Sequence, residues 1–109
     1  MPKSILIALT NPVSAARDAD FNRWYNEVHA DDILSLPTVS SITRYRSLRQ
    51  IRPHDGEPTH RYLAVYEMDN PHAAVEGLIA ARPSFAMSDA MASDPVAMTF
   101  VPIFSKLRT

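Results

Sequence analysis

The sequence has no cysteine, which excludes disulfide bonds, thiolate metal ligands and a cysteine nucleophile. It contains only two glycines, and it has neither a glycine-rich phosphate loop nor a G-x-S-x-G turn. These absences disfavour nucleotide binding and serine hydrolase chemistry. No two histidines share metal-ligand spacing with a carboxylate on one element, so we predict no metal and no cofactor.

The sequence also lacks a large excess of charge of one sign and long hydrophobic runs. The formal net charge of −1 leaves no basic stripe, so we expect no nucleic-acid partner. The longest apolar run, at residues 5–9, is far shorter than the roughly 20 residues that span a bilayer. It lacks a small-residue cleavage site, so we read no signal peptide there. We therefore expect no membrane partner and a cytoplasmic location.

What the chain does contain is typical of one globular domain. Its 109 residues, 46% apolar and 21% charged, are enough for a single core, so we predict one domain over residues 1–109. Hydrophobic periodicity, proline and turn residues divide it into strand 3–9, helix 21–36, strand 39–49, polar loop 50–60, strand 60–68, helix 71–82, irregular arm 83–95 and strand 96–107.

The order β-α-β-β-α-β predicts an α+β, ferredoxin-like fold: a four-stranded antiparallel sheet with two helices on one face. Asn70, followed by Pro71, is expected to cap the second helix, and Asp18 or Asp20 to cap the first. Pro102 in the last strand favours an edge position or a bulge.

The predicted strands are apolar on both faces, as residues 5–9 show, whereas a sheet with one wet face alternates apolar and polar residues. Two helices can cover only one face. We therefore predict a homodimer in which the two sheets pack face to face.

The first helix carries the main candidates for chemistry. At 100° per residue, one stripe holds the residues Phe21, Trp24, Tyr25, Val28 and Asp32. His29 lies on its flank, four residues after Tyr25 and three before Asp32. A carboxylate near a histidine fixes its tautomer and raises its basicity, as a general base requires. The spacing equally allows a hydrogen-bonded histidine at the helix end, with Asp32 capping the next turn.

Other strands and the arm supply further candidates. Tyr62 and Tyr66 share a strand face, and a phenol beside a cavity can donate to a substrate carbonyl. Phe85, Met87 and Met91 could form a lid over an apolar ligand or simply fill the core. We expect the substrate to be bound by Phe21, Trp24, Val28, Tyr45, Phe85, Met91 and Phe100.

A longer pattern runs through this region: W-Y-x-x-x-H-x-x-D, then L-x-L-P-x-V, then an R-Y strand. Its residues are Trp24, Tyr25, His29, Asp32, Leu34, Leu36, Pro37, Val39, Arg44 and Tyr45. The pattern resembles the EthD-like branch of the dimeric α/β-barrel superfamily, and residues 61–68 resemble the third strand of that branch. The match covers about residues 3–70, and it departs at Thr38, where the family usually has glycine.

The resemblance implies a dimer of ferredoxin-like subunits, each with a hydrophobic pocket between its helices and its sheet. Members of the superfamily include polyketide cyclases, muconolactone isomerase, dehydratases, decarboxylases, cofactor-free quinone-forming monooxygenases and haem-binding enzymes. The family's histidine maps to His29 and its helix acid to Asp32.

We therefore predict a cofactor-independent lyase, isomerase or cyclase acting on a small hydrophobic, aromatic or polyketide-like carbonyl or phenolic compound. His29, oriented by Asp32, would take a proton, and a tyrosine (Tyr25, Tyr62 or Tyr66) would donate to the developing enolate. The alternatives are a cofactor-free or haem-dependent monooxygenase of the same superfamily and a non-catalytic binder of an apolar metabolite. The sequence does not choose the substrate or the reaction.

Overall fold

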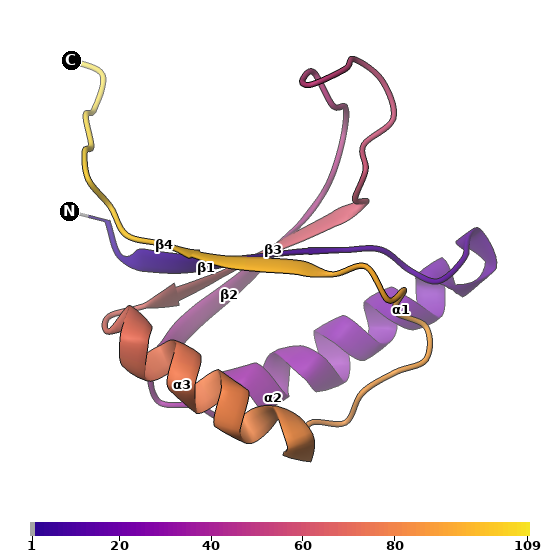
Figure 1. The fold of residues 1–109 in the computed structure, drawn as a ribbon, viewed down its shortest axis with the longest axis horizontal. Coiled ribbons are helices and arrows are strands. Elements are labelled where there is room, and N and C mark those ends of the chain that lie inside the picture. Colours follow the sequence, from indigo (N-terminus) through magenta and orange to yellow (C-terminus); the bar gives the residue numbers. More distant parts are fainter. Residues whose placement is uncertain (1) are drawn as a thin grey trace.

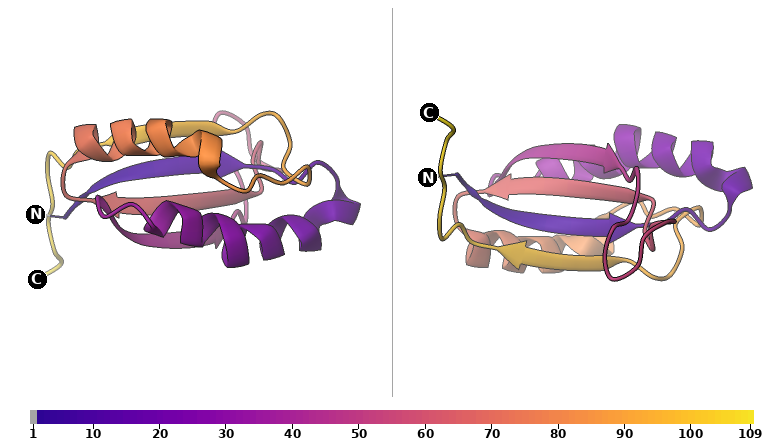
Figure 2. Two further views of the ribbon diagram at one scale, coloured as in Figure 1. Left: turned by 90° about the horizontal axis from the view of Figure 1, so that it is seen from below. Right: turned by 90° about the horizontal axis from the view of Figure 1, so that it is seen from above.

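The computed structural model describes residues 2–109. Its elements in chain order are β1 (Ser4–Thr10), η1 (Ala15–Arg17), α1 (Asp18–Trp24), the π-helical η2 (Tyr25–His29), α2 (Ala30–Leu34), β2 (Val39–Arg46), β3 (Tyr62–Met68), α3 (Pro71–Ala81), η3 (Arg82–Ser84) and β4 (Val96–Phe100). The four strands form one antiparallel sheet in the order β2-β3-β1-β4. Both helical segments cover the same face of it (Figures 1 and 2), which confirms the α+β, ferredoxin-like fold.

The strand register sets which side chains face the helices. Leu6 pairs with Tyr66, and Ala8 pairs with Ala64, and all four are buried. Because side chains alternate between faces along a strand, this parity forms the floor of the core beneath the helices.

The first helix is continuous from α1 to α2, but its middle turn is wider than an α-helical turn. The amide of Ala30 donates to the carbonyl of Tyr25, five residues earlier. In a regular α-helix, residues four positions apart lie about 40° apart around the helix axis, so a row of such residues gradually turns away from one face. The wider turn reduces that drift, so Phe21, Tyr25 and Ile33 are all at most 1% exposed.

This wide turn overturns part of the predicted stripe. Val28 is 37% exposed and faces away from the core, so the prediction that it lies on the inner side of the helix is wrong. The predicted cap is also wrong: Asp18 and Asp20 lie inside the first turn, and Arg17 occupies the N-cap position without a capping hydrogen bond from its side chain. The cap of α3 is confirmed, because the Asn70 side chain accepts a hydrogen bond from the Ala73 amide.

The last strand is shorter than predicted. β4 ends at Phe100 rather than at residue 107, and residues 101–109 have no regular secondary structure. Pro102 therefore lies beyond the strand, whose edge position in the sheet is as predicted. Figure 1 shows this tail and the long β2–β3 connection both rising on the side of the sheet away from the helices.

No helix covers the second face of the sheet, and only the β2–β3 connection and the tail after β4 lie on its side (Figures 1 and 2). It is apolar across its centre, where Ile7 pairs with Val65 of β3 on one side and with Met98 of β4 on the other. Tyr45 and Phe100, 53% and 45% exposed, lie on this face. Contrary to prediction, neither lines a pocket beneath the helices, because the strand parity turns both away from them.

Candidate active site

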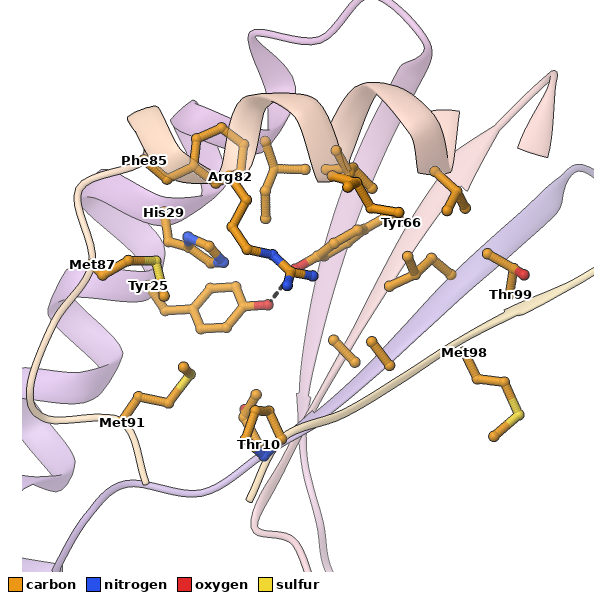
Figure 3. Close-up of a pocket in the computed structure, with 18 residues that line it drawn as sticks. Thr10, Tyr25, His29, Tyr66, Arg82, Phe85, Met87, Met91, Met98 and Thr99 are labelled. Carbon is orange, nitrogen blue, oxygen red and sulfur yellow. Dashed lines mark hydrogen bonds between the residues drawn. The ribbon is translucent and has the colours of Figure 1, made fainter. Parts of the chain in front are cut away.

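A cavity of about 700 Å³ lies between the sheet, the first helix and α3. Its volume is within the range of roughly 300–1,000 Å³ that small-molecule sites occupy. Most of its lining is apolar, and the arm after α3 contributes Phe85, Met87 and Met91 to it (Figure 3). The polar side chains that line it are Thr10, Tyr25, His29, Tyr66, Arg82 and Thr99.

His29 faces this cavity rather than bulk solvent. Its ring stacks on Trp24 with centroids 4.6 Å apart and meets the edge of Tyr25 at 4.9 Å. Its buried Nδ1 has no hydrogen-bond partner, so the alternative of a fully hydrogen-bonded histidine at the helix end is wrong. Burial lowers the pKa of His29, an effect that nearby Asp32 opposes and Arg44 reinforces. The imidazole is therefore neutral at pH 7 and able to accept a proton.

Asp32 makes no hydrogen bond to the imidazole. Its Oδ2 accepts a hydrogen bond of 3.1 Å from the amide of Ala86 in the arm, and it caps no turn through its side chain. The Trp24 Nε1 donates to the carbonyl of the same Ala86 at 2.7 Å. Asp32 and Trp24 thus bind the amide and the carbonyl of the same residue and hold the arm against the first helix. Asp32 affects His29 only through its charge.

Two tyrosines meet in the cavity lining, Tyr25 from the first helix and Tyr66 from β3. The hydroxyls of Tyr25 and Tyr66 lie 2.5 Å apart (Figure 3), and both side chains are buried. Burial raises the pKa of Tyr25 and of Tyr66, so both phenols stay protonated at neutral pH. Two hydroxyls carry two hydrogens and their mutual bond uses one, which leaves one donor for a ligand.

Tyr62 is placed elsewhere. Its hydroxyl donates to Asp18 Oδ1 at 2.6 Å and accepts from Asn22 Nδ2 at 3.0 Å, and its ring packs on Phe21. It does not line the cavity. Its predicted role as a proton donor to the substrate therefore has no support in the geometry.

Arg44 supports the tyrosine pair from behind, and sequence reasoning assigned it no role. Its guanidinium lies 4.2 Å from the Tyr25 ring centroid and donates to Asn26 Oδ1 at 2.7 Å and to Asn22 Oδ1 at 2.9 Å. The cation partly offsets the effect of burial on the pKa of Tyr25. Period-two alternation with Ile42, which packs on the core, would have placed Arg44 on the helix side.

The predicted binding residues on the first helix lie behind the cavity wall. Phe21 is fully buried against Tyr25, Trp24 lies behind His29, and Val28 faces outward, so none of the three lines the cavity. Phe85 and Met91 do line it. Arg82, the first residue of η3, lines it as well, and the sequence offered no signal for this beyond its place at a helix end.

Two further observations concern ligands and membranes. In residues 2–109, no three histidine, aspartate or glutamate side chains come together as a metal site would require. Within the same range, no helix combines the length and the apolar character needed to cross a bilayer.

No family model matches the chain, and no curated protein matches it. Solved structures do. A dabb family protein with a ferredoxin-like fold from Mesorhizobium loti has a TM-score of 0.60 at 12% identity, over 95% of this chain and 100% of that one. A dimeric ferredoxin-like protein of unknown function from Thermobifida fusca has a TM-score of 0.56 at 17% identity, over 94% and 93%.

A protein from Shewanella loihica proposed to be a monooxygenase has a TM-score of 0.51 at 16% identity, over 100% of this chain and 99% of that one. At these identities the comparisons establish a shared ferredoxin-like fold over nearly the whole chain. Function has to be argued from the cavity and its side chains.

Proposed function

We propose that this protein is a cofactor-independent acid/base enzyme of the EthD-like branch of the dimeric α/β-barrel superfamily. Its substrate is a small hydrophobic carbonyl or phenolic compound, aromatic or polyketide-like. One observation carries the proposal: a neutral imidazole, His29, lines a mostly apolar cavity of about 700 Å³ together with a tyrosine pair that has a hydroxyl hydrogen to spare.

The first step moves a proton to His29. The substrate lies against the apolar lining, and the imidazole accepts a proton from the carbon next to its carbonyl or from its hydroxyl. Negative charge then develops on the substrate oxygen, where the free hydroxyl of the Tyr25–Tyr66 pair donates a hydrogen bond. A placed base contributes roughly 10²–10⁴ in rate, and one donor in a dry site about 3 kcal/mol.

This proton transfer is common to several reactions. Elimination, isomerisation, aldol-type cyclisation and retro-aldol cleavage can each begin by removing a proton and stabilising an enolate oxygen. The lyase, isomerase and cyclase classes therefore share one test, which is whether His29 removes a proton.

The test follows deuterium exchange beside a ketone by NMR, in D₂O, with 2-tetralone and related aromatic ketones as probes. We expect the protein to accelerate exchange, and His29→Ala to lose at least about 100-fold of that acceleration because the base is gone. His72→Ala, at an exposed histidine outside the cavity, is the matched control and should exchange as the wild type does. Near-normal exchange in His29→Ala would exclude the proposed base.

A second candidate is a cofactor-free monooxygenase, favoured by the structural likeness to the Shewanella loihica protein proposed to be one. Here His29 would take the proton of a hydroquinone-like phenol, and the electron-rich phenolate would react with O₂. Oxygen uptake with a hydroquinone-like substrate, lost in His29→Ala, distinguishes this activity from exchange alone. Ligand-induced stabilisation with neither exchange nor oxygen uptake would instead indicate a binder.

A further inference from the structure

Arg82 lines the same cavity, and neither the sequence nor the proposed proton transfer gives it a role. Figure 3 shows its side chain reaching from the end of α3 into the cavity. Throughout residues 2–109, no carboxylate lies within ion-pair distance of its guanidinium, and no side chain hydrogen-bonds to it. By contrast, the side chains of Arg17, Arg44 and Arg49 have acidic or amide partners.

The backbone that carries Arg82 is held in place. Its amide donates to the carbonyl of Leu78 in the last turn of α3, and its carbonyl accepts from the Phe85 amide at 3.1 Å. The carbonyl of Ala81, the residue before Arg82, accepts a hydrogen bond of 2.7 Å from the Ser84 hydroxyl. The guanidinium thus extends from a rigid point while its own donors are free.

The rest of the cavity lining does not balance this charge. The lining contains no aspartate, glutamate or lysine, so Arg82 is its one formally charged residue. Arg82 is itself exposed, so its charge lies at the solvent-facing edge of this apolar lining, where it can attract an entering anion.

We propose that the substrate carries a carboxylate and that Arg82 binds it. The planar guanidinium presents two parallel N–H groups that match the two oxygens of a carboxylate. The apolar part of the molecule then extends along the lining towards His29 and the tyrosine pair. The inference rests on the proposed function, since it names the substrate class of the same cavity: a hydrophobic carboxylic acid.

Arg82 also lies at the end of a helix, where a cation stabilises the macrodipole. A purely structural role of this kind changes the melting temperature of the protein. It gives no preference between a charged ligand and a neutral ligand of the same shape, and the experiment uses that difference.

The experiment measures, by titration calorimetry, the affinity for 2-naphthoate and for 2-naphthamide, which share their rings and shape but differ in charge. We expect the wild type to prefer the carboxylate by at least about tenfold. Arg82→Gln should weaken 2-naphthoate binding by about 10–100-fold, the range for hydrogen bonds to charged groups, and 2-naphthamide binding by less than about twofold. Arg82→Lys keeps the positive charge but loses the two parallel N–H groups. Its affinity for 2-naphthoate should therefore lie between those of the wild type and Arg82→Gln.

Arg46→Gln is the matched control, because Arg46 is exposed at the end of β2 and outside the cavity; it should bind both probes as the wild type does. Equal affinity for the two probes, or an equal loss for both in Arg82→Gln, would overturn the proposal. Unchanged affinities with a lower melting temperature would assign Arg82 to the helix dipole and overturn it too. Measuring both probes on His29→Ala keeps the two proposals apart, since loss of the base should leave the carboxylate preference in place.

Discussion

At the scale of single residues, His29 has an unusual position. A buried polar atom without a partner costs roughly 1–3 kcal/mol, so folded chains seldom leave one without a reason. The Nδ1 of His29 is such an atom, and it belongs to a ring that also faces a cavity. A ligand that donates to this ring or gives it a proton would satisfy it.

The stacking of His29 on Trp24 gives a direct measurement of its charge. Trp24 is the only tryptophan, and a protonated imidazole at 4.6 Å quenches indole emission. Because burial lowers the pKa of His29 from its usual 6.5, we expect the emission to change with a midpoint below pH 6.5. His29→Gln should abolish the transition and His72→Gln should preserve it.

The same shift affects stability. The unfolded chain binds a proton at His29 near pH 6.5, whereas the folded chain does so only at lower pH, so unfolding is favoured as the pH falls through this window. The contribution of His29 is fully present above pH 6.5. A Trp24 midpoint at or above 6.5 would contradict the burial of this imidazole.

At the scale of elements, the arm after α3 lies along the cavity because two side chains of the first helix bind one of its residues. Asp32 accepts from the Ala86 amide and Trp24 donates to the Ala86 carbonyl. The arm also pairs with the chain after β1, where the Val13 amide donates to the Ala90 carbonyl at 2.7 Å. The arm beside the cavity is therefore hydrogen-bonded to the first helix and to the chain after β1.

Asp32→Ala should loosen the attachment of the arm to the first helix. It removes the acceptor of the Ala86 amide, whose hydrogen exchange, measured by NMR, should accelerate by at least about fivefold, since such bonds contribute about 1 kcal/mol or more. Asp32→Asn keeps an acceptor oxygen and should accelerate exchange less. Because the Asp32 charge raises the pKa of His29, both variants should lower the Trp24 midpoint.

Asp31→Ala, at the exposed neighbouring carboxylate, is the control and should leave Ala86 exchange unchanged. If Ala86 exchanges at the wild-type rate in Asp32→Ala, the carboxylate does not hold the arm.

At the scale of the whole molecule, the uncovered sheet face argues for a second copy of the chain. Ile7 and its neighbours form an apolar centre on that face, and exposed hydrophobic side chains also line the tail after β4. Large exposed apolar patches mark interaction sites. We propose a homodimer through the sheet faces, because a second copy of the chain is the simplest cover for an apolar face that neither helix covers.

Light scattering coupled to gel filtration tests this assembly. The wild type should be a dimer at micromolar concentration, and Ile7→Glu should be monomeric or aggregated because it buries a charge at the centre of the interface. Tyr45→Glu places a charge at a more exposed position on the same face, so it should weaken the dimer less than Ile7→Glu and leave the subunit folded. Leu34→Glu, at an exposed leucine on α2, should remain dimeric. A folded wild-type monomer would remove the inference.

Much of the fold could be predicted because its signals are local. The alternation of apolar runs with turns predicts the element order, and Asn70 with Pro71 marks the start of α3. The inward direction of His29 also follows from its spacing of four residues from Tyr25. The wide turn could not be predicted, since it depends on a backbone bond from Ala30 to Tyr25 that no side-chain pattern marks.

The candidate site could likewise be predicted only in part from the sequence. Local periodicity by itself determined the order of strands and helices and brought Tyr25 and His29 to one side of a helix, because these relations span only a few residues. Only the tertiary structure decided that Asp32 binds an amide 54 residues away, and that Arg82 enters the cavity. Such contacts depend on how elements distant in the sequence pack, and a charged residue has the same local pattern whether it ends in solvent or in a cavity.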